Sequence, residues 1–149
     1  MRLTHYTDYT LRVLTYLGAR PGERSTIREI SEAYGVSRNH LMKVVQQLAA
    51  EGWVDSVRGV GGGLMLADDA LDVSIGTIVR AVEADFDLVE CMRADNKCAI
   101  TPACRLAGML REARQAFFDV LDRYTLGDLV SSGNRNELAG LLGIRLRIA

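Results

Sequence analysis

The chain of 149 residues is long enough for one sizeable hydrophobic core, or for one small domain with an extended helix, and it leaves little room for two independent domains. Hydrophobic residues at 48% and charged residues at 25% exclude a disordered or fibrous protein. A formal net charge of -1 excludes a uniformly basic coat for nucleic acid, but residues 1–66 carry 8 Lys and Arg against 6 Asp and Glu, so any basic face lies in the N-terminal half.

We expect a cytoplasmic protein without a membrane-spanning segment. No apolar run approaches the roughly 18 residues of a membrane span, and the start, MRLTHYTD, lacks the apolar region of a secretory signal. Thiols in the cytoplasm stay reduced. The 3 cysteines therefore do not indicate a disulfide framework, and their confinement to a window of 14 residues favours metal or redox chemistry.

The N-terminal part of the chain shows the pattern of three helices. Apolar residues at helical spacing predict a first helix over residues 7–19. Ser25 or Thr26 can cap a second helix, and Glu29 follows Thr26 by three residues, as in a capping box. A third helix is predicted over residues 38–51 from a further apolar stripe.

A tight turn joins the second and third helices, because Gly35 can take the positive φ that ends one helix and Ser37 can cap the next. This arrangement is typical of a helix-turn-helix, whose second helix enters the major groove of DNA, although similar helical hairpins occur elsewhere. The predicted DNA contacts lie near the start of the third helix: Ser37, Arg38, Asn39, His40 and Lys43. We assign the cations to phosphates and Asn39 to phosphate or base; His40 can equally be an ordinary surface histidine.

A β-hairpin after the third helix completes a winged pattern. Residues 53–58 alternate like a strand, residues 59–63 form a glycine-rich turn, and residues 64–67 can return as a second strand. Arg58 and Gly59 lie at the wing's edge, where a guanidinium beside glycines can enter the minor groove. The glycine run also matches a phosphate loop weakly, but a dinucleotide-binding loop opens into a helix, and here an apolar stretch follows.

The predicted domains are a winged helix-turn-helix domain over residues 1–67, a connecting helix and cysteine loop over 68–103, a dimerisation helix with a last turn over 104–130, and a flexible tail over 131–149. The long helix carries one apolar stripe: Leu106, Met109, Leu110, Ala113, Phe117, Val120, Leu121 and Tyr124. Such a stripe indicates a core helix or a homodimer seam, and we favour the seam because so small a domain cannot cover it. The predicted fold class is mainly α with a small β-hairpin wing.

The cysteines, Cys91, Cys98 and Cys104, predict an iron-sulfur cluster. Their C-x6-C-x5-C spacing differs from zinc knuckles and from bacterial ferredoxins. Thr101 and Pro102 form a good N-cap and first-turn pair, which places Cys104 in the first turn of the long helix, where N–H groups favour a thiolate. Candidates for a fourth ligand are His5, His40, Asp8, Glu90 and Asp95, or a ligand from outside. Structural zinc and a metal-free thiol switch remain alternatives.

Four motifs resemble the Rrf2 family of winged-helix regulators and, within it, the nitric-oxide-sensing repressors. They are MRLTHYTDYTLR at residues 1–12, VSRNHLMK at 36–43, RGVGGG at 58–63 and ITPACRL at 100–106. The resemblance implies a homodimeric repressor that reads a palindromic operator in double-stranded DNA and responds to nitric oxide. It further implies that the cluster is held by Cys91, Cys98, Cys104 and Asp8 of the partner subunit.

One position separates two branches of the resembled family. IscR-like members place a histidine ligand three residues after the last cysteine, where this chain has Ala107, and this favours a [4Fe-4S] over a [2Fe-2S] cluster. An acidic residue at a helix start is also an ordinary capping choice, so the fourth ligand is either Asp8 of the partner subunit or an external thiol. Rival functions are an IscR-type sensor of cluster supply or redox state and a winged DNA binder with structural zinc. An electron-transfer or enzymatic iron-sulfur protein has no use for the winged domain, so we expect no enzyme.

Overall fold

Three helices from the first third of the chain pack around one hydrophobic core in the computed structural model, which describes residues 2–57 and 59–144. They are α1 (His5–Gly18), α2 (Ile27–Tyr34) and α3 (Arg38–Ala50), and they confirm the predicted helices. The fully or almost fully buried apolar side chains include Val13, Leu14, Leu17, Ile30, Leu41, Val44, Val45 and Leu48. Burial of one such large side chain contributes about 1.5–3 kcal/mol, so this shared core holds the three helices together.

Local signals fix the ends of these helices, with one exception. The predicted capping box of α2 is present: Glu29 N–H donates to Thr26 Oγ1, and Thr26 N–H donates to the Glu29 carboxylate at 2.6 Å. Gly35 has a φ of 63° and closes α2 as predicted. Ser37 occupies the N-cap position of α3 but makes no capping hydrogen bond, so the predicted cap is wrong. The first N–H groups of α3 are therefore open to an outside acceptor.

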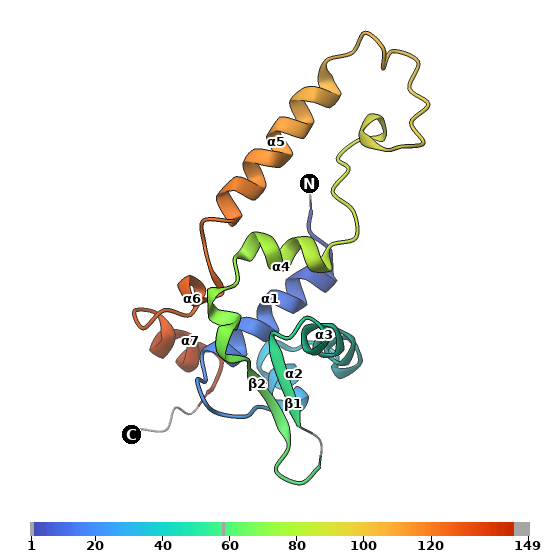
Figure 1. Ribbon diagram of the computed structural model, residues 1–149. Coiled ribbons are helices and arrows are strands. Elements are labelled where there is room, and N and C mark those ends of the chain that lie inside the picture. The colour runs from blue at the N-terminus through green and yellow to red at the C-terminus, as the bar shows by residue number, and fades with distance from the viewer. Residues whose placement is uncertain (1, 58, 145–149) are drawn as a thin grey trace.

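The predicted hairpin is present as the antiparallel strands β1 (Val54–Val57) and β2 (Gly63–Leu66). The segment before α2 adds an antiparallel bridge to β2: Ser25 N–H donates to Leu64 O at 2.8 Å, and Leu64 N–H donates to Ser25 O at 2.7 Å. The hairpin is thus tied through β2 to the segment before α2, and its tip projects beyond the helices (Figure 1). Arg58 lies outside the described residues.

The elements of the second half of the chain are η1 (Asp68–Asp72), α4 (Ile75–Val82), η2 (Glu90–Met92), α5 (Leu106–Leu121), α6 (Leu126–Leu129) and α7 (Arg135–Leu141). This half crosses α1, extends outward through the cysteine loop and α5, and returns to the helical body with α6 and α7 (Figure 1). Ser74 caps α4 as predicted, its Oγ accepting from Thr77 N–H at 3.0 Å. Figure 1 shows α5, in orange, extending away from the other helices, with the yellow cysteine loop at its far end. None of the helices in the described ranges has the length and apolar character that a membrane span requires.

Two predicted boundaries are wrong. The long helix begins at Leu106 rather than at residue 104, because residues 101–103 form a turn and Arg105 takes the N-cap position. A flexible tail does not begin at residue 131, since α7 forms over residues 135–141 and buries Ala139 against the core. The remainder of that predicted tail, residues 145–149, lies outside the described residues.

A paired arginine fixes the base of α5 to α4. The Arg80 guanidinium donates to both carboxylate oxygens of Asp122, each at 2.7 Å, and lies 4.2 Å from the centroid of the Phe118 ring. The hydrogen bonds from Arg80 lower the pKa of Asp122, so the ion pair persists at pH values below the ordinary pKa of an aspartate. One end of α5 is therefore attached to the helical body, while the other end carries the cysteine loop.

Gly18 allows α1 to pack directly against Val130. An added Cβ would lie 2.8 Å from Cγ2 of Val130, which is itself buried. We expect Gly18→Ala to lower the free energy of unfolding by about 1–3 kcal/mol through overpacking, measured by urea denaturation. The control is Gly140→Ala in α7, where nothing lies within 4 Å of the added methyl group and helix propensity favours alanine by up to about 1 kcal/mol. Equal changes in both variants would argue against this close contact.

Candidate functional site

All three cysteines lie in the loop between α4 and α5, Cys91 within the short η2 and the other two in irregular backbone, and each is free and partly exposed. A closed set of hydrogen bonds shapes the middle of the loop. Asn96 Nδ2 donates to Thr101 Oγ1 at 2.8 Å, the Thr101 hydroxyl donates to Cys98 O at 2.8 Å, and Cys98 N–H donates to Asn96 Oδ1 at 2.9 Å. Both backbone polar groups of Cys98 are thus held, which makes its position the best defined of the three.

Cys104 lies just before α5, so its predicted placement inside the first turn is wrong. The predicted Thr101 and Pro102 cap is also absent, since Thr101 uses its hydroxyl within the loop. The start of α5 nevertheless faces the thiol, because Leu106 N–H donates to Cys104 Sγ at 3.4 Å. The expected contact between a helix N-terminus and the last cysteine is therefore present, with α5 starting two residues beyond the thiol.

The three thiols do not form a preassembled metal site. Among the described residues, no three His, Cys, Asp or Glu side chains lie close enough together to hold a metal ion. The donor set still fits an iron-sulfur cluster, because thiolates are its usual ligands and none of these sulfurs is in a disulfide. No residue from 83 to 106 is buried, so the loop has no core that would resist rearrangement around a ligand.

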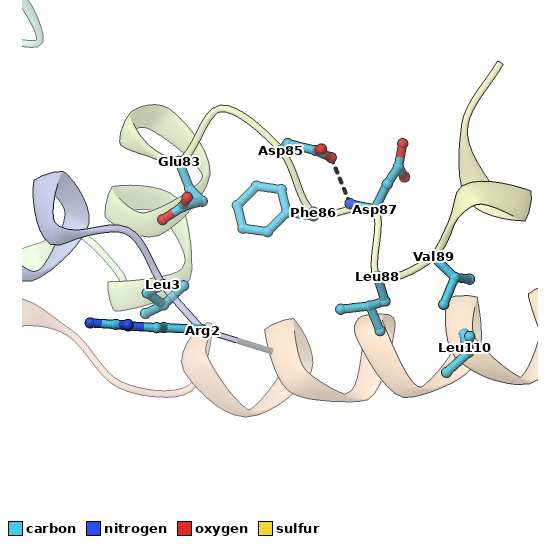
Figure 2. Close-up of a pocket in the computed structure, with 9 residues that line it drawn as sticks. All are labelled: Arg2, Leu3, Glu83, Asp85, Phe86, Asp87, Leu88, Val89 and Leu110. Carbon is cyan, nitrogen blue, oxygen red and sulfur yellow. Dashed lines mark hydrogen bonds between the residues drawn. The ribbon is translucent and has the colours of Figure 1, made fainter. Parts of the chain in front are cut away.

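The segment that leads from α4 to the cysteines packs along α5. Figure 2 shows this segment passing Arg2 and Leu3 of the N-terminus, with Leu88 and Val89 directed toward the helix that carries Leu110. These residues line a cavity of about 420 Å³. The Phe86 ring meets the Phe118 ring edge to face, 4.8 Å between centroids. The segment over residues 83–89 is thus held at its start, and we call it the arm.

Glu83, at the start of the arm, binds the N-terminus of α1. Its Oε2 accepts from Thr4 N–H at 3.0 Å, from the Thr4 hydroxyl at 3.1 Å, and from the hydroxyl of the fully buried Thr7. A carboxylate at a helix N-terminus is also favoured by the helix dipole. The sequence analysis missed this residue, because Thr4 and Glu83 are 79 positions apart and no local motif joins them.

Asp8 lies on α1 and is paired within its own helix. Its carboxylate accepts from Arg12 at 2.9 and 3.1 Å, and both side chains are about 40% exposed, at 43% and 40%. Arg12 lies 5.6 Å from the centroid of the Tyr34 ring, whose pKa burial raises to about 12, so the phenol remains neutral. Exposed ion pairs of this spacing contribute only about 0.3–0.5 kcal/mol, so Asp8 can exchange Arg12 for another partner at little cost.

The predicted nucleic-acid contacts lie together at the exposed start of α3. The exposed residues are Ser37, Arg38, Asn39, His40 and Lys43. Met42 and Gln46 are exposed on the same face and were not predicted. Gly59, on the wing, is exposed with a φ of 97°, a conformation that favours glycine.

Tyr6 and Gln47 tie α3 to its neighbours. The Tyr6 hydroxyl of α1 donates to Gln47 Oε1 at 2.7 Å and lies 3.2 Å from Lys43 O. The Gln47 amide in turn donates to Ala81 O of α4 at 2.9 Å. Because α4 also begins the arm through Glu83, one set of polar contacts connects the arm, α1 and α3.

Comparison with known proteins agrees with this architecture. Residues 3–132 match the Rrf2 family, described as an iron-dependent transcriptional regulator. The HTH-type transcriptional regulator NsrR of Bacillus subtilis (strain 168) is 50% identical over 97% of this chain and 99% of that protein, and its namesake from Geobacillus kaustophilus (strain HTA426) is 45% identical over 95% and 97%.

Solved structures show the same fold. CymR, the global cysteine regulator of B. subtilis, superposes with a TM-score of 0.68 at 28% identity, covering 87% of this chain and 95% of that chain. T. potens IscR superposes with a TM-score of 0.63 at 23% identity, covering 92% and 91%. The predicted fold class, mainly α with a small hairpin wing, is thereby confirmed. This chain therefore belongs to the Rrf2 family of transcriptional regulators.

Proposed function

We propose that the protein is a homodimeric transcriptional repressor that binds an operator through its winged domains and loses DNA binding when nitric oxide reacts with an iron-sulfur cluster. The observation that carries this proposal is the loop with three free thiols and no buried residue, in a chain whose relatives are named NsrR. A repressor that responds to a signal needs a group that reacts with it. The three free thiols suit this loop to hold such a group, because thiolates are the usual ligands of iron-sulfur clusters.

The proposed DNA-reading surface is the exposed start of α3 together with the wing. Helix α3 would enter the major groove with Arg38 and Lys43 at phosphates and Asn39 at a phosphate or a base. The open N–H groups at the start of α3 suit a phosphate as well, because helix N-termini bind anions. Arg58 and Gly59 are assigned to the minor groove.

The proposed dimer seam is the apolar face of α5. On α5, Leu106, Met109 and Val120 remain 49%, 61% and 43% exposed within one chain, and Tyr124, just beyond the end of the helix, is 53% exposed. A contiguous apolar surface on a projecting helix is typical of a protein interface. A second copy that covers this face would also bring its own α1 toward the cysteine loop, as a shared cluster requires.

Cys91, Cys98 and Cys104 would hold the cluster, with Asp8 of the partner subunit as the fourth ligand. We favour [4Fe-4S], because the position of the histidine ligand in IscR-like members is Ala107, which is buried. When bound, the cluster supplies irons that react with nitric oxide. The unburied loop takes whatever shape its thiols impose, and Asp8 returns to Arg12 when it loses its outside partner.

The contacts of Glu83 supply a route from the loop to the DNA. A change in the arm acts on Thr4 and Thr7 at the start of α1, and the Tyr6 hydroxyl passes it to α3 through Gln47. These hydrogen bonds form a continuous set of contacts between the arm, α1 and α3, and we propose that they couple the arm to the DNA-reading helix.

Anaerobic purification tests the proposal. We expect a brown protein with about four irons and four sulfides per chain. Nitric oxide added under nitrogen should bleach its absorption and abolish the electrophoretic shift of operator DNA. Colourless protein with stoichiometric zinc, or DNA binding that nitric oxide leaves unchanged, would contradict it.

Asp8→Ala tests the fourth ligand. We expect a changed absorption spectrum or faster cluster loss in air, with the free energy of unfolding altered by no more than about 0.5 kcal/mol, because the pair with Arg12 is exposed. Glu32→Ala is the matched control, since it removes another exposed carboxylate paired at the same helical spacing, with Arg28 at 2.7 Å. If Asp8→Ala has the spectrum and cluster lifetime of the control, Asp8 is not a ligand.

A further inference from the structure

A row of three stacked rings joins α1 to α3 on the protein surface. The His5 and Tyr9 rings lie 6.0 Å apart with an interplanar angle of 23°, and the Tyr9 and His40 rings lie 6.0 Å apart at 22°. Both histidines are exposed and Tyr9 is partly exposed. We call these three residues the ring row; the chain has 2 histidines, and both belong to it.

Cationic and hydrogen-bonding groups surround the ring row. A hollow of about 260 Å³ beside it is lined by His5, Tyr6, Tyr9, His40 and Lys43, without a carboxylate. Arg2 adds a cation at one end, with Nη2 3.4 Å from His5 Nε2. The nearest acidic residue along α1 is Asp8, and its charge is paired with Arg12.

We propose that the ring row is a phosphate-binding surface through which α1 contacts the DNA backbone beside the groove occupied by α3. The proposal rests on the proposed DNA-binding function and adds His5 and Tyr9 of α1 to it. His40 makes the row continuous with the start of α3, so DNA docked on that helix runs along it. Imidazolium, ammonium and guanidinium donors suit phosphate oxygens, and exposed ring faces suit the sugar next to them.

This surface would make DNA binding depend on pH. Imidazole is the side chain that changes charge between about pH 5 and 8. Arg2 and Lys43 are the cations beside the row. The carboxylates on the elements packed against it are Asp8, which pairs with Arg12, and Glu83, which accepts from Thr4 and Thr7 at the start of α1. Each phosphate neutralised steepens the dependence of log K on log salt by about 0.9.

The test uses the anaerobically purified full-length protein and a DNA duplex that it selects from a random library. Fluorescence anisotropy gives the salt slope at about pH 6 and about pH 8. We expect the slope to be steeper at pH 6 by up to about 1.8 per chain, two phosphates at about 0.9 each. His5→Gln should remove about half of this difference and leave the slope at pH 8 unchanged. His5→Lys should keep the steeper contribution at both pH values, which a purely structural role of the ring would not do.

Arg123→Gln is the control for the loss of one exposed cation, and its slopes should match the wild type at both pH values. Equal wild-type slopes at pH 6 and pH 8 would overturn the proposal, as would a His5→Lys protein that behaves like His5→Gln. Failure of the wild-type protein to select any duplex would instead contradict the proposed DNA-binding function, so the two failures are distinguishable.

Discussion

Replacement of Cys98 by serine is expected to abolish iron-sulfur binding and to make DNA binding insensitive to nitric oxide. The chain has 3 cysteines, and the other two are already assigned as ligands, so no further thiol can take the place of Cys98. Serine offers a hard hydroxyl oxygen, which is a poor ligand for iron in a sulfur cluster. Iron and acid-labile sulfide content, together with gel-shift assays with and without nitric oxide, measure the effect.

The fold should survive this change, because the cysteine loop contains no buried residue. Circular dichroism and urea unfolding of Cys98→Ser are expected to match those of the cluster-free wild type. Ala99→Ser is the matched control, since it adds the same hydroxyl at an exposed neighbouring position and keeps all three thiols. A Cys98→Ser protein with full iron and sulfide content would remove this thiol from the ligand set.

The parts of the fold that the sequence predicts are those with local causes. Helix α2 and its turn can be predicted from the sequence because their signals are local. These signals are the capping box of Thr26 and Glu29 and the positive φ of Gly35, each of which acts over three or four residues. The same holds for the hairpin, whose alternation and glycine turn lie within about a dozen residues. The apolar stripe of α5 likewise predicts a long helix with an uncovered face.

Features that depend on distant parts of the chain could not be predicted in this way. Helix α7 forms where its apolar residues meet a surface built by the N-terminal helices, and its own sequence is too short for a periodic signal. Two further features form only when the chain has folded. They are the bridge between Ser25 and the wing and the contacts of Glu83 with α1.

The candidate site also has a part that can be predicted from local sequence and a part that cannot. Three thiols in a short window predict a metal-binding loop, because their chemistry is a property of the residues themselves. Their convergence is not encoded by a core, since no residue from 83 to 106 is buried; under the proposed function it would come from the ligand and the second subunit. The assignment of the thiols as ligands stays a prediction, whereas the predicted placement of Cys104 inside a helix is wrong, because α5 begins two residues later.

Replacement of Glu83 by alanine is expected to uncouple the cysteine loop from the DNA-reading helix. The change removes the acceptor of Thr4 N–H and of the buried Thr7 hydroxyl, so the free energy of unfolding should fall by about 1–3 kcal/mol. With the arm released from α1, the ratio of DNA affinities before and after nitric oxide should fall toward one, while the cluster still forms. Anisotropy titrations and the cluster spectrum measure the two effects separately.

Asp85→Asn is the control that isolates the role of Glu83, because it alters a carboxylate two residues further along the arm. Asp85 accepts from Asp87 N–H at 2.7 Å and lies 3.6 Å from Arg93, contacts that do not reach α1. This variant should keep the wild-type affinity ratio, whereas Glu83→Gln, which retains one acceptor oxygen, should give an intermediate ratio. If Glu83→Ala forms the cluster and keeps the wild-type ratio, the signal travels by another route, and the dimer seam of α5 becomes the element that carries it.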